Sequence, residues 1–337
     1  MTDVQKHSAQ ELAAKVPLRL HVGLPKTATT LLQSSLFPVH SQVEYLGTWH
    51  TREYRRFSKF QNAVVQSAVA AADNRRAPEQ ELDRCRQAID EQLAPARAAG
   101  KIPVFSWETL MDCRPDVREQ RAVNWARAFG PCRVMITVRN PLSFVESMYF
   151  QLLRAENVGG ASRRFGGPRY RTVDQWLDKA WDSRRMVPKT FLQYAETAQM
   201  YARIFGRESV GVFVFEEFPA DPDRYIHSIC RFLGIDGDES ARLVRGQRKG
   251  DRWTEGQIAA LKRVSRSPWQ SLKFRLADRK RRREMLGITF APPQDEPKAH
   301  AEFGTAWRKR IEDFTRPGNQ ILVNEWGLSL ADHGYAA

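Results

Sequence analysis

The chain has 337 residues, of which 42% are apolar and 10% aromatic, so it can bury a sizeable core and is not a wholly disordered chain. Lys and Arg number 53 against 39 Asp and Glu, a formal charge of +14 that points to nucleic acid, an anionic membrane face or a polyanionic small substrate as partner. No apolar run is long enough to span a bilayer, and no internal repeat predicts a solenoid.

The cysteines and the first residues bear on where the protein works. The four cysteines are widely separated and form no C-x-x-C pair: Cys85, Cys113, Cys132 and Cys230. A disulfide scaffold or a zinc site needs closer spacing, so we expect reduced thiols and no bound metal. Residues 1–15 are polar and lack the apolar core of a secretion signal. These features favour a cytoplasmic protein.

The first predicted element is a strand over residues 18–22, where apolar and polar residues alternate. It leads directly into a polar loop at 23–30 and then into a short helix that ends near Pro38. A helix over 79–99 and a strand over 102–106 follow.

The best strand of the sequence covers residues 133–138, which are β-branched and almost wholly apolar, as in a parallel strand buried on both faces. Asn140 and Pro141 then suit the N-cap and the first turn of a helix. The glycine- and arginine-rich residues 158–171 predict a loop. Further predictions are helices over 172–182, 190–205 and 222–233 and a strand over 210–215.

Strands that alternate with helices predict an α/β fold of three layers, in which a mainly parallel sheet is flanked by helices. Ligands of such sheets bind beyond the carboxyl ends of the strands. We therefore expect Lys26, residues 106–108, Arg139 and residues 216–217 along one edge of the sheet. Glu216 and Glu217 are expected to be scaffold acids that orient a loop there.

The loop after the first strand has the chemistry of an anion site. Backbone N–H groups at a helix start, the Lys26 ammonium and the threonine hydroxyls all favour a negative charge. An ATP-binding loop would carry a second glycine and place its lysine later. The segment Gly23-Leu24-Pro25-Lys26-Thr27-Ala28-Thr29-Thr30 instead resembles the 5′-phosphosulfate loop of sulfotransferases that use 3′-phosphoadenosine 5′-phosphosulfate (PAPS). Ala28 stands where that family more commonly has glycine.

The segment 138–147 resembles the 3′-phosphate motif of the same family, in which a buried strand ends in arginine and a serine follows eight residues later. Arg139 would offer its planar guanidinium, and Ser147 its hydroxyl, to the phosphate. A weaker resemblance at 247–250 suggests that Arg248, Lys249 and Gly250 close over that phosphate.

The resemblance implies a fold related to P-loop nucleotide-binding proteins and in-line transfer of a sulfuryl group from PAPS to a hydroxyl or amine, without a metal ion. Lys26 would stabilise the leaving phosphate. Glu108, in a Ser-x-Glu segment beside Trp107, is the candidate general base, because the tryptophan would desolvate the carboxyl and raise its pKa. His50 is the alternative base. No motif identifies the acceptor; a glycan or glycolipid comes first and a small alcohol second.

Most of the positive charge lies in residues 242–283, which hold 15 Lys or Arg and only 3 acids. We predict a sulfotransferase domain over residues 1–250 and a basic helical extension over 251–337 packed on it. Residues 265–283 interleave Trp, Phe and Leu with basic residues, so peripheral attachment to the anionic inner face of a membrane stays open. No motif for specific nucleic-acid binding occurs.

Two other functions remain open on the sequence. A P-loop kinase of a small molecule would use the same kind of loop, although the missing glycine and the early lysine count against it. A non-enzymatic protein could bind a membrane surface or nucleic acid through its basic segment.

Overall fold

The computed structural model describes residues 17–46, 78–108, 115–158, 168–183, 188–247, 252–288 and 296–336. Five strands form one sheet in the order β2-β3-β1-β4-β5, and each neighbouring pair is parallel. The strands are β1 (Leu18–His21), β2 (Val43–Tyr45), β3 (Ile102–Ser106), β4 (Cys132–Val138) and β5 (Val210–Val214).

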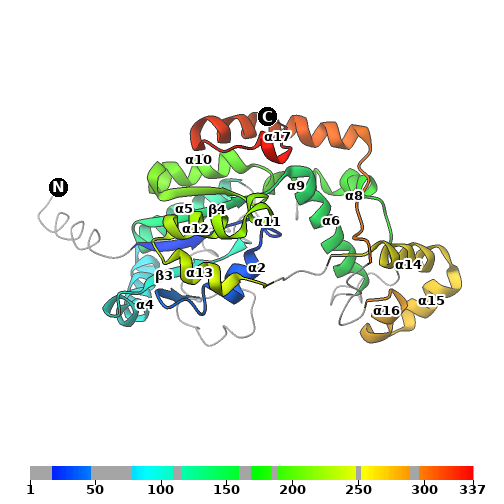
Figure 1. Ribbon diagram of the computed structural model, residues 1–337, viewed down its shortest axis with the longest axis horizontal. Helices are drawn as coiled ribbons and strands as arrows, with labels where there is room; N and C mark the ends of the chain where they lie inside the picture. Colours follow the sequence, from blue (N-terminus) through cyan, green and yellow to red (C-terminus); the bar gives the residue numbers. More distant parts are fainter. Residues whose placement is uncertain are drawn as a thin grey trace, which may run out of the picture. The chain divides into compact units, whose positions relative to one another are not determined.

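The helices that connect the strands and extend the chain are α2 (Thr29–Leu31), η1 (Leu32–Leu36), α4 (Glu79–Ala98), α5 (Pro115–Phe129), α6 (Pro141–Asn157), α8 (Val173–Ala180), α9 (Pro188–Phe191), α10 (Tyr194–Phe205), η4 (Arg207–Ser209), α11 (Glu217–Ala220), α12 (Pro222–Leu233), α13 (Gly237–Val244), α14 (Glu255–Arg266), α15 (Pro268–Leu276), α16 (Arg279–Met285), α17 (Thr305–Trp326) and η5 (Ala331–His333). Figure 1 shows their arrangement.

The sheet lies between two layers of helices. On one face, side chains of η1, α12 and α13 form a core with strand residues that include Val104 and Met135. On the other face, α10 contacts β4 and β5, and α4 contacts β3. The predicted α/β fold, with a parallel sheet flanked by helices, is therefore confirmed.

The four predicted strands appear close to their expected positions: β1 was predicted from alternating apolar and polar residues, and the other three are mostly apolar. β4 is the clearest case: Arg133 alone among its seven residues is not buried. The sequence reading missed β2 and α5. β2 has only three residues and lies at an edge of the sheet, so its pattern is too short to predict a strand.

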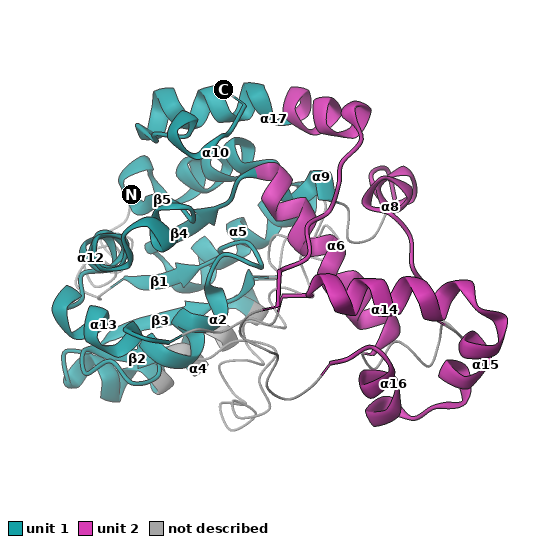
Figure 2. Cartoon of the chain, turned by 45° about the vertical axis from the view of Figure 1, so that its right-hand side comes forward, with its two compact units in different colours: residues 1–140, 185–249, 315–337 teal, residues 141–184, 250–314 magenta. Residues whose placement is uncertain are grey.

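The chain divides into two compact units, coloured separately in Figure 2. Unit 1 comprises residues 1–140, 185–249 and 315–337 and contains the sheet. Unit 2 comprises residues 141–184 and 250–314. One change of unit thus falls where we expected a domain boundary, near residue 250; the expected pair of domains remains a prediction.

Unit 2 has its own buried and half-buried contacts. The indole nitrogen of Trp253 donates to the carbonyl oxygen of Phe150 at 2.9 Å, and the Trp181 and Trp307 rings lie 5.6 Å apart. Glu146 pairs with Arg252 at 2.6 Å. Among the described residues, no helix combines the length and the hydropathy that a membrane crossing requires.

Candidate functional site

The loop between β1 and α2 leaves the central strand of the sheet, and two of its residues have positive φ angles. Lys26 has φ 71° and Ala28 has φ 59°, both in the left-handed region that residues with a Cβ avoid. The Thr27 hydroxyl donates to the carbonyl oxygen of Leu24 at 2.6 Å and closes the turn from inside. Thr27 and Thr29 are buried, whereas Lys26 and Thr30 are exposed.

The conformation of Ala28 explains the sequence preference at this position. Glycine adopts the left-handed region without steric cost, so a family in which the loop has this shape favours glycine there. The alanine keeps the same backbone at a cost of about 1–2 kcal/mol. The loop therefore holds its shape despite the departure from the motif.

Glycine is needed at position 23 for a different reason, because a buried side chain lies directly against its Cα. A Cβ at this position would lie 2.5 Å from Nε2 of His21, which is buried at the end of β1. Burial lowers the pKa of His21 to about 4, so the imidazole is neutral at neutral pH. The first glycine of the motif thus lets the loop pass over a buried histidine.

Glu108 lies at the end of β3, the neighbour of β1, and interacts with the loop. Burial raises the pKa of its carboxyl, while hydrogen bonds with Thr29 and Gln33 and the charge of Lys26 partly oppose the shift. The adjacent Trp107 is buried and its ring centre lies 6.3 Å from that of Trp125 on α5, so its part in desolvating Glu108 stays a prediction. The structure thus brings Glu108, Lys26 and Thr29 together.

Buried polar side chains form a hydrogen-bonded network next to the Glu108 carboxyl. The Ser106 hydroxyl lies 2.8 Å from Nδ1 of His21 and accepts a hydrogen bond from Nε2 of Gln33, also at 2.8 Å. Gln33 belongs to η1, a π-helical turn, a form often found near functional sites. The sequence reading did not single out Gln33 or His21; a polar residue inside an apolar run was the available signal.

Arg139 follows β4, on the other side of β1. Its Nη1 donates to the carbonyl oxygen of Lys26 at 2.8 Å, and its guanidinium carbon lies 5.0 Å from the centre of the Phe215 ring. The two loops predicted to hold opposite ends of one ligand are therefore joined directly. Both loops lie at the edge of the sheet formed by the carboxyl ends of the strands, where we expected them, because β1 and β4 are parallel neighbours.

The turn after Arg139 is held by the end of the chain. Glu216 accepts from the backbone N–H of Asn140 and from the Tyr335 hydroxyl, both at 2.9 Å. The Asn140 side chain donates to the carbonyl oxygens of His333 and Gly334 at 3.2 and 2.9 Å. Glu216 is thus a scaffold acid, as predicted. We name residues 330–336 the C-terminal clasp; the sequence reading missed it.

Other predicted site residues are not joined to this group. Ser147 lies on α6 in unit 2, whereas the loop and Arg139 belong to unit 1, so its pairing with Arg139 remains a prediction. Arg248, Lys249 and Gly250 lie outside the described residues, and so does His50. Within the described ranges, no group of three or more His, Cys, Asp or Glu side chains could hold a metal ion.

Comparison with known proteins gives one family. The Sulfotransferase family profile matches residues 20–239, which include the loop, Glu108, Arg139 and all of the sheet except the first two residues of β1. None of the curated proteins searched matches the chain.

Solved structures that match the chain include a sulfotransferase from Alicyclobacillus acidocaldarius, with 15% identity, a TM-score of 0.52, and coverage of 95% of this chain and 99% of the other. The sulfotransferase domain of the Synechococcus PCC 7002 olefin synthase has 15% identity, a TM-score of 0.38, and coverage of 82% and 96%. Mouse sulfotransferase SULT7A1 complexed with PAP has 14% identity, a TM-score of 0.38, and coverage of 70% and 68%.

Proposed function

Because the chain belongs to the sulfotransferase family, we propose that it moves the sulfuryl group of PAPS to a hydroxyl or amine of an acceptor. The observation that carries this proposal is the junction of three loops at one edge of the sheet. Lys26 follows β1, Glu108 follows β3 and Arg139 follows β4. The charge of Lys26 acts on the Glu108 carboxyl, and the carbonyl oxygen of Lys26 accepts a hydrogen bond from Arg139.

The residues at this edge fit a polyanionic donor by their chemistry. Lys26 is an exposed cation beside the buried hydroxyls of Thr27 and Thr29, and Thr30 adds an exposed hydroxyl. We assign Lys26, Thr27, Ala28, Thr29 and Thr30 to the 5′-phosphosulfate end of PAPS. A few Å away, Arg139 presents a guanidinium suited to a second phosphate. Its partners there are proposed to be Ser147, Arg248, Lys249 and Gly250.

In the proposed reaction, PAPS supplies an activated sulfuryl group whose bond to the 5′-phosphate breaks as a bond to the acceptor oxygen or nitrogen forms. Lys26 stabilises the charge that grows on the leaving phosphate. Glu108 takes the proton of the acceptor, and its raised pKa brings the carboxyl closer to the range in which a general base works at neutral pH. Lys26 and Thr29 hold that carboxyl in place.

Sulfuryl transfer also needs an acceptor molecule. We assign it to a glycan or glycolipid, with a small alcohol as the alternative, and we place the enzyme in the cytoplasm, where PAPS-dependent transfer to a lipid-borne acceptor would occur at the inner membrane face. Residues 265–283 would then meet the anionic lipid surface.

Direct binding tests the donor assignment. We expect PAP, the product nucleotide, to bind the wild-type chain in calorimetry, and Arg139→Ala to weaken binding about tenfold or more through loss of charge-assisted hydrogen bonds. Arg224→Ala, an exposed arginine on α12, is the matched control and should bind PAP normally. Equal affinities in the two variants would remove Arg139 from the site.

Turnover separates the two catalytic roles. Glu108→Gln should lower kcat by about 10²-fold or more while PAP affinity is kept, and Lys26→Ala should lower it by a similar factor. Transfer of labelled sulfate from PAPS, run with a chelator, is compared with phosphate transfer from ATP and magnesium. Turnover with ATP and magnesium alone would replace the proposal by a P-loop kinase.

A further inference from the structure

Exposed apolar side chains gather on one short helix of unit 2. Five large apolar side chains are exposed in the described residues, and α15 carries three of them: Trp269 (65% exposed), Leu272 (46%) and Leu276 (81%). Their spacing of three and four residues puts them on one face of the helix. Phe274, by contrast, is buried. The helix therefore buries Phe274 on one side and carries a separate, exposed apolar stripe on the other face.

The arginine run that follows α15 holds this helix in place. Arg282 is the buried member of the run; it donates to the carbonyl oxygens of Phe274, Arg275 and Ala277 at 3.0 Å each, and its guanidinium lies 5.3 Å from the Phe274 ring centre. It thus satisfies carbonyl groups at the end of α15, where a positive charge also suits the helix dipole. The apolar stripe is presented by an anchored helix.

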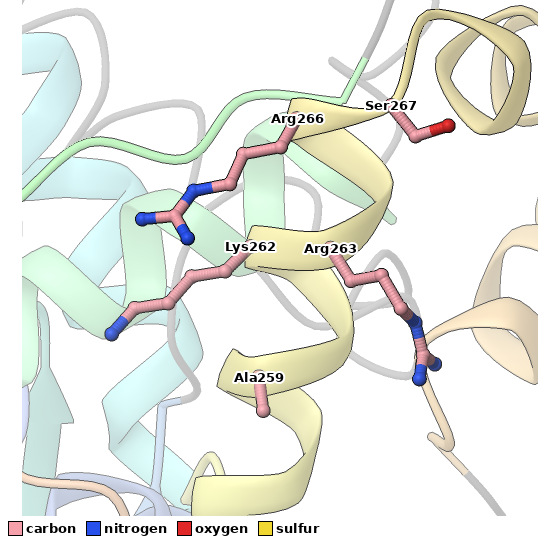
Figure 3. A pocket seen from close by; sticks show the side chains of 5 residues that line it. All are labelled: Ala259, Lys262, Arg263, Arg266 and Ser267. Carbon is pink, nitrogen blue, oxygen red and sulfur yellow. The ribbon is translucent and has the colours of Figure 1, made fainter.

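A cationic depression precedes the stripe. It measures about 510 Å³ and is lined by Ala259, Lys262, Arg263, Arg266 and Ser267 (Figure 3). In that view, Lys262 and Arg266 extend to one side of α14 and Arg263 to the other. Ser267 also caps α15 by accepting from the backbone N–H of Gln270. The cationic depression therefore lies next to the start of α15, the helix that bears the apolar stripe.

We infer that α14 and α15 form a docking surface for anionic phospholipid bilayers, with lipid phosphates at Lys262, Arg263 and Arg266 and the α15 stripe at the level of the acyl chains. Residues 252–288 hold eleven basic and three acidic residues, which complements an anionic lipid surface. Three apolar side chains that project from one helix face suit a deformable bilayer, which adapts to them. Tryptophan favours the membrane interface. Lys273 lies 5.2 Å from the Trp269 ring and can keep its charge at headgroup level.

This surface would bring the enzyme to an acceptor carried by a membrane lipid. Only this connection between the surface and the acceptor rests on the proposed sulfuryl transfer. Membrane binding itself needs neither PAPS nor turnover. Vesicle binding measured without nucleotide therefore stands or falls separately from the donor site.

The test is sedimentation of the full chain with vesicles of phosphatidylcholine alone or of phosphatidylcholine with phosphatidylglycerol. We expect binding only to the anionic vesicles, weakened by added salt. Leu272→Ser with Leu276→Ser should reduce the partition coefficient about tenfold or more, and Lys262→Glu with Arg266→Glu should do the same. Val39→Ser, which changes an exposed valine in unit 1 (56% exposed), is the matched control and should bind as the wild type does.

Several outcomes would overturn the inference. These are wild-type failure to bind anionic vesicles, unchanged binding of the double leucine variant, and equal loss in the Val39→Ser control. Heparin or RNA binding that survives while vesicle binding is absent would assign the basic surface to a different polyanion. Displacement from vesicles by millimolar inorganic phosphate alone would reduce the site to a simple anion site. Far-UV circular dichroism of each variant verifies that the fold is kept.

Discussion

Ala28 is one of two non-glycine residues with a positive φ among those described, and both belong to the loop at the proposed donor site. Strained backbone of this kind persists where the surroundings determine it. Here the Ala28 carbonyl accepts from the backbone N–H groups of Leu31 and Leu32, so the residue starts the helix that follows. The shape of the loop is thus set by its connection to α2, not by the identity of residue 28.

Ala28→Gly tests this account of the loop. Relief of the left-handed strain, about 1–2 kcal/mol, is offset by the greater chain entropy of glycine when unfolded, about 0.5–1 kcal/mol. We expect the free energy of unfolding in urea to stay level or to rise by about 1 kcal/mol. Ala126→Gly, within α5, should instead lose about 1 kcal/mol. Equal losses in both variants would contradict the strain at Ala28.

Among the elements, the C-terminal clasp connects most directly to the proposed donor site. It is anchored by buried Leu330 and by the Asn319 side chain, which donates to the carbonyl oxygen of Ala336 at 2.7 Å. Tyr335 reaches Glu216, and Glu216 holds the backbone next to Arg139. Tyr194, buried on α10, donates to the Arg139 carbonyl oxygen at 2.8 Å. The turn that carries Arg139 is therefore fixed from three elements.

Tyr335 is expected to act as a positioning residue for Arg139. Burial and the nearby Glu216 raise the pKa of Tyr335 well above its usual value, so the hydroxyl stays a donor at neutral pH. Removing this hydrogen bond in Tyr335→Phe should weaken PAP binding about three- to tenfold and change kcat little at saturating PAPS. Amide exchange at Asn140, measured without nucleotide, should become faster.

A buried tyrosine elsewhere in unit 1 provides the control. Tyr225→Phe, at a buried position of α12, should leave PAP affinity and exchange at Asn140 unchanged. If Tyr335→Phe lowers the melting temperature while affinity and exchange stay as in the wild type, the clasp has a purely structural role.

On the scale of the whole molecule, the free energy of unfolding changes with pH through His21, which is buried in unit 1. The imidazole has a pKa of about 4 when folded against an ordinary value of about 6.5. Because the unfolded chain takes up the proton first as the pH falls, His21 stabilises the fold above pH 6.5, and this contribution is lost as the pH approaches 4.

Acid sensitivity of the folded chain should therefore fall when His21 is removed. By pH 5 the wild type is expected to lose about 2 kcal/mol of unfolding free energy through this group. His21→Gln keeps a polar side chain near Ser106 but does not titrate, so its loss between pH 7 and pH 5 should be smaller by that amount. Urea unfolding at the two pH values measures the difference. Parallel curves for the two proteins would mean that His21 is not the titrating group.

The family and much of the fold could be predicted because they depend on local patterns. Alternating apolar and polar residues predicted β1, mostly apolar segments predicted β3, β4 and β5, and the order of strands and helices predicted a parallel sheet. Since the carboxyl ends of parallel strands meet at one edge, the sequence also predicted that Lys26, Glu108 and Arg139 would lie close together. The motifs at residues 23–30 and 138–147, together with the predicted strand end before Glu108, were sufficient for that prediction.

The tertiary structure decided what surrounds those residues, because the contacts join segments far apart in the chain. Tyr335 and Glu216 are 119 residues apart, and His21 and Ser106 are 85 apart, so no local pattern connects them. The basic segment shows the same division. Its charge was visible in the sequence, but only the fold turns Arg282 inward, leaves Trp269 and Leu276 exposed, and places three cations around one depression. Composition alone thus pointed to an anionic partner, while packing decided which cationic and apolar side chains are exposed.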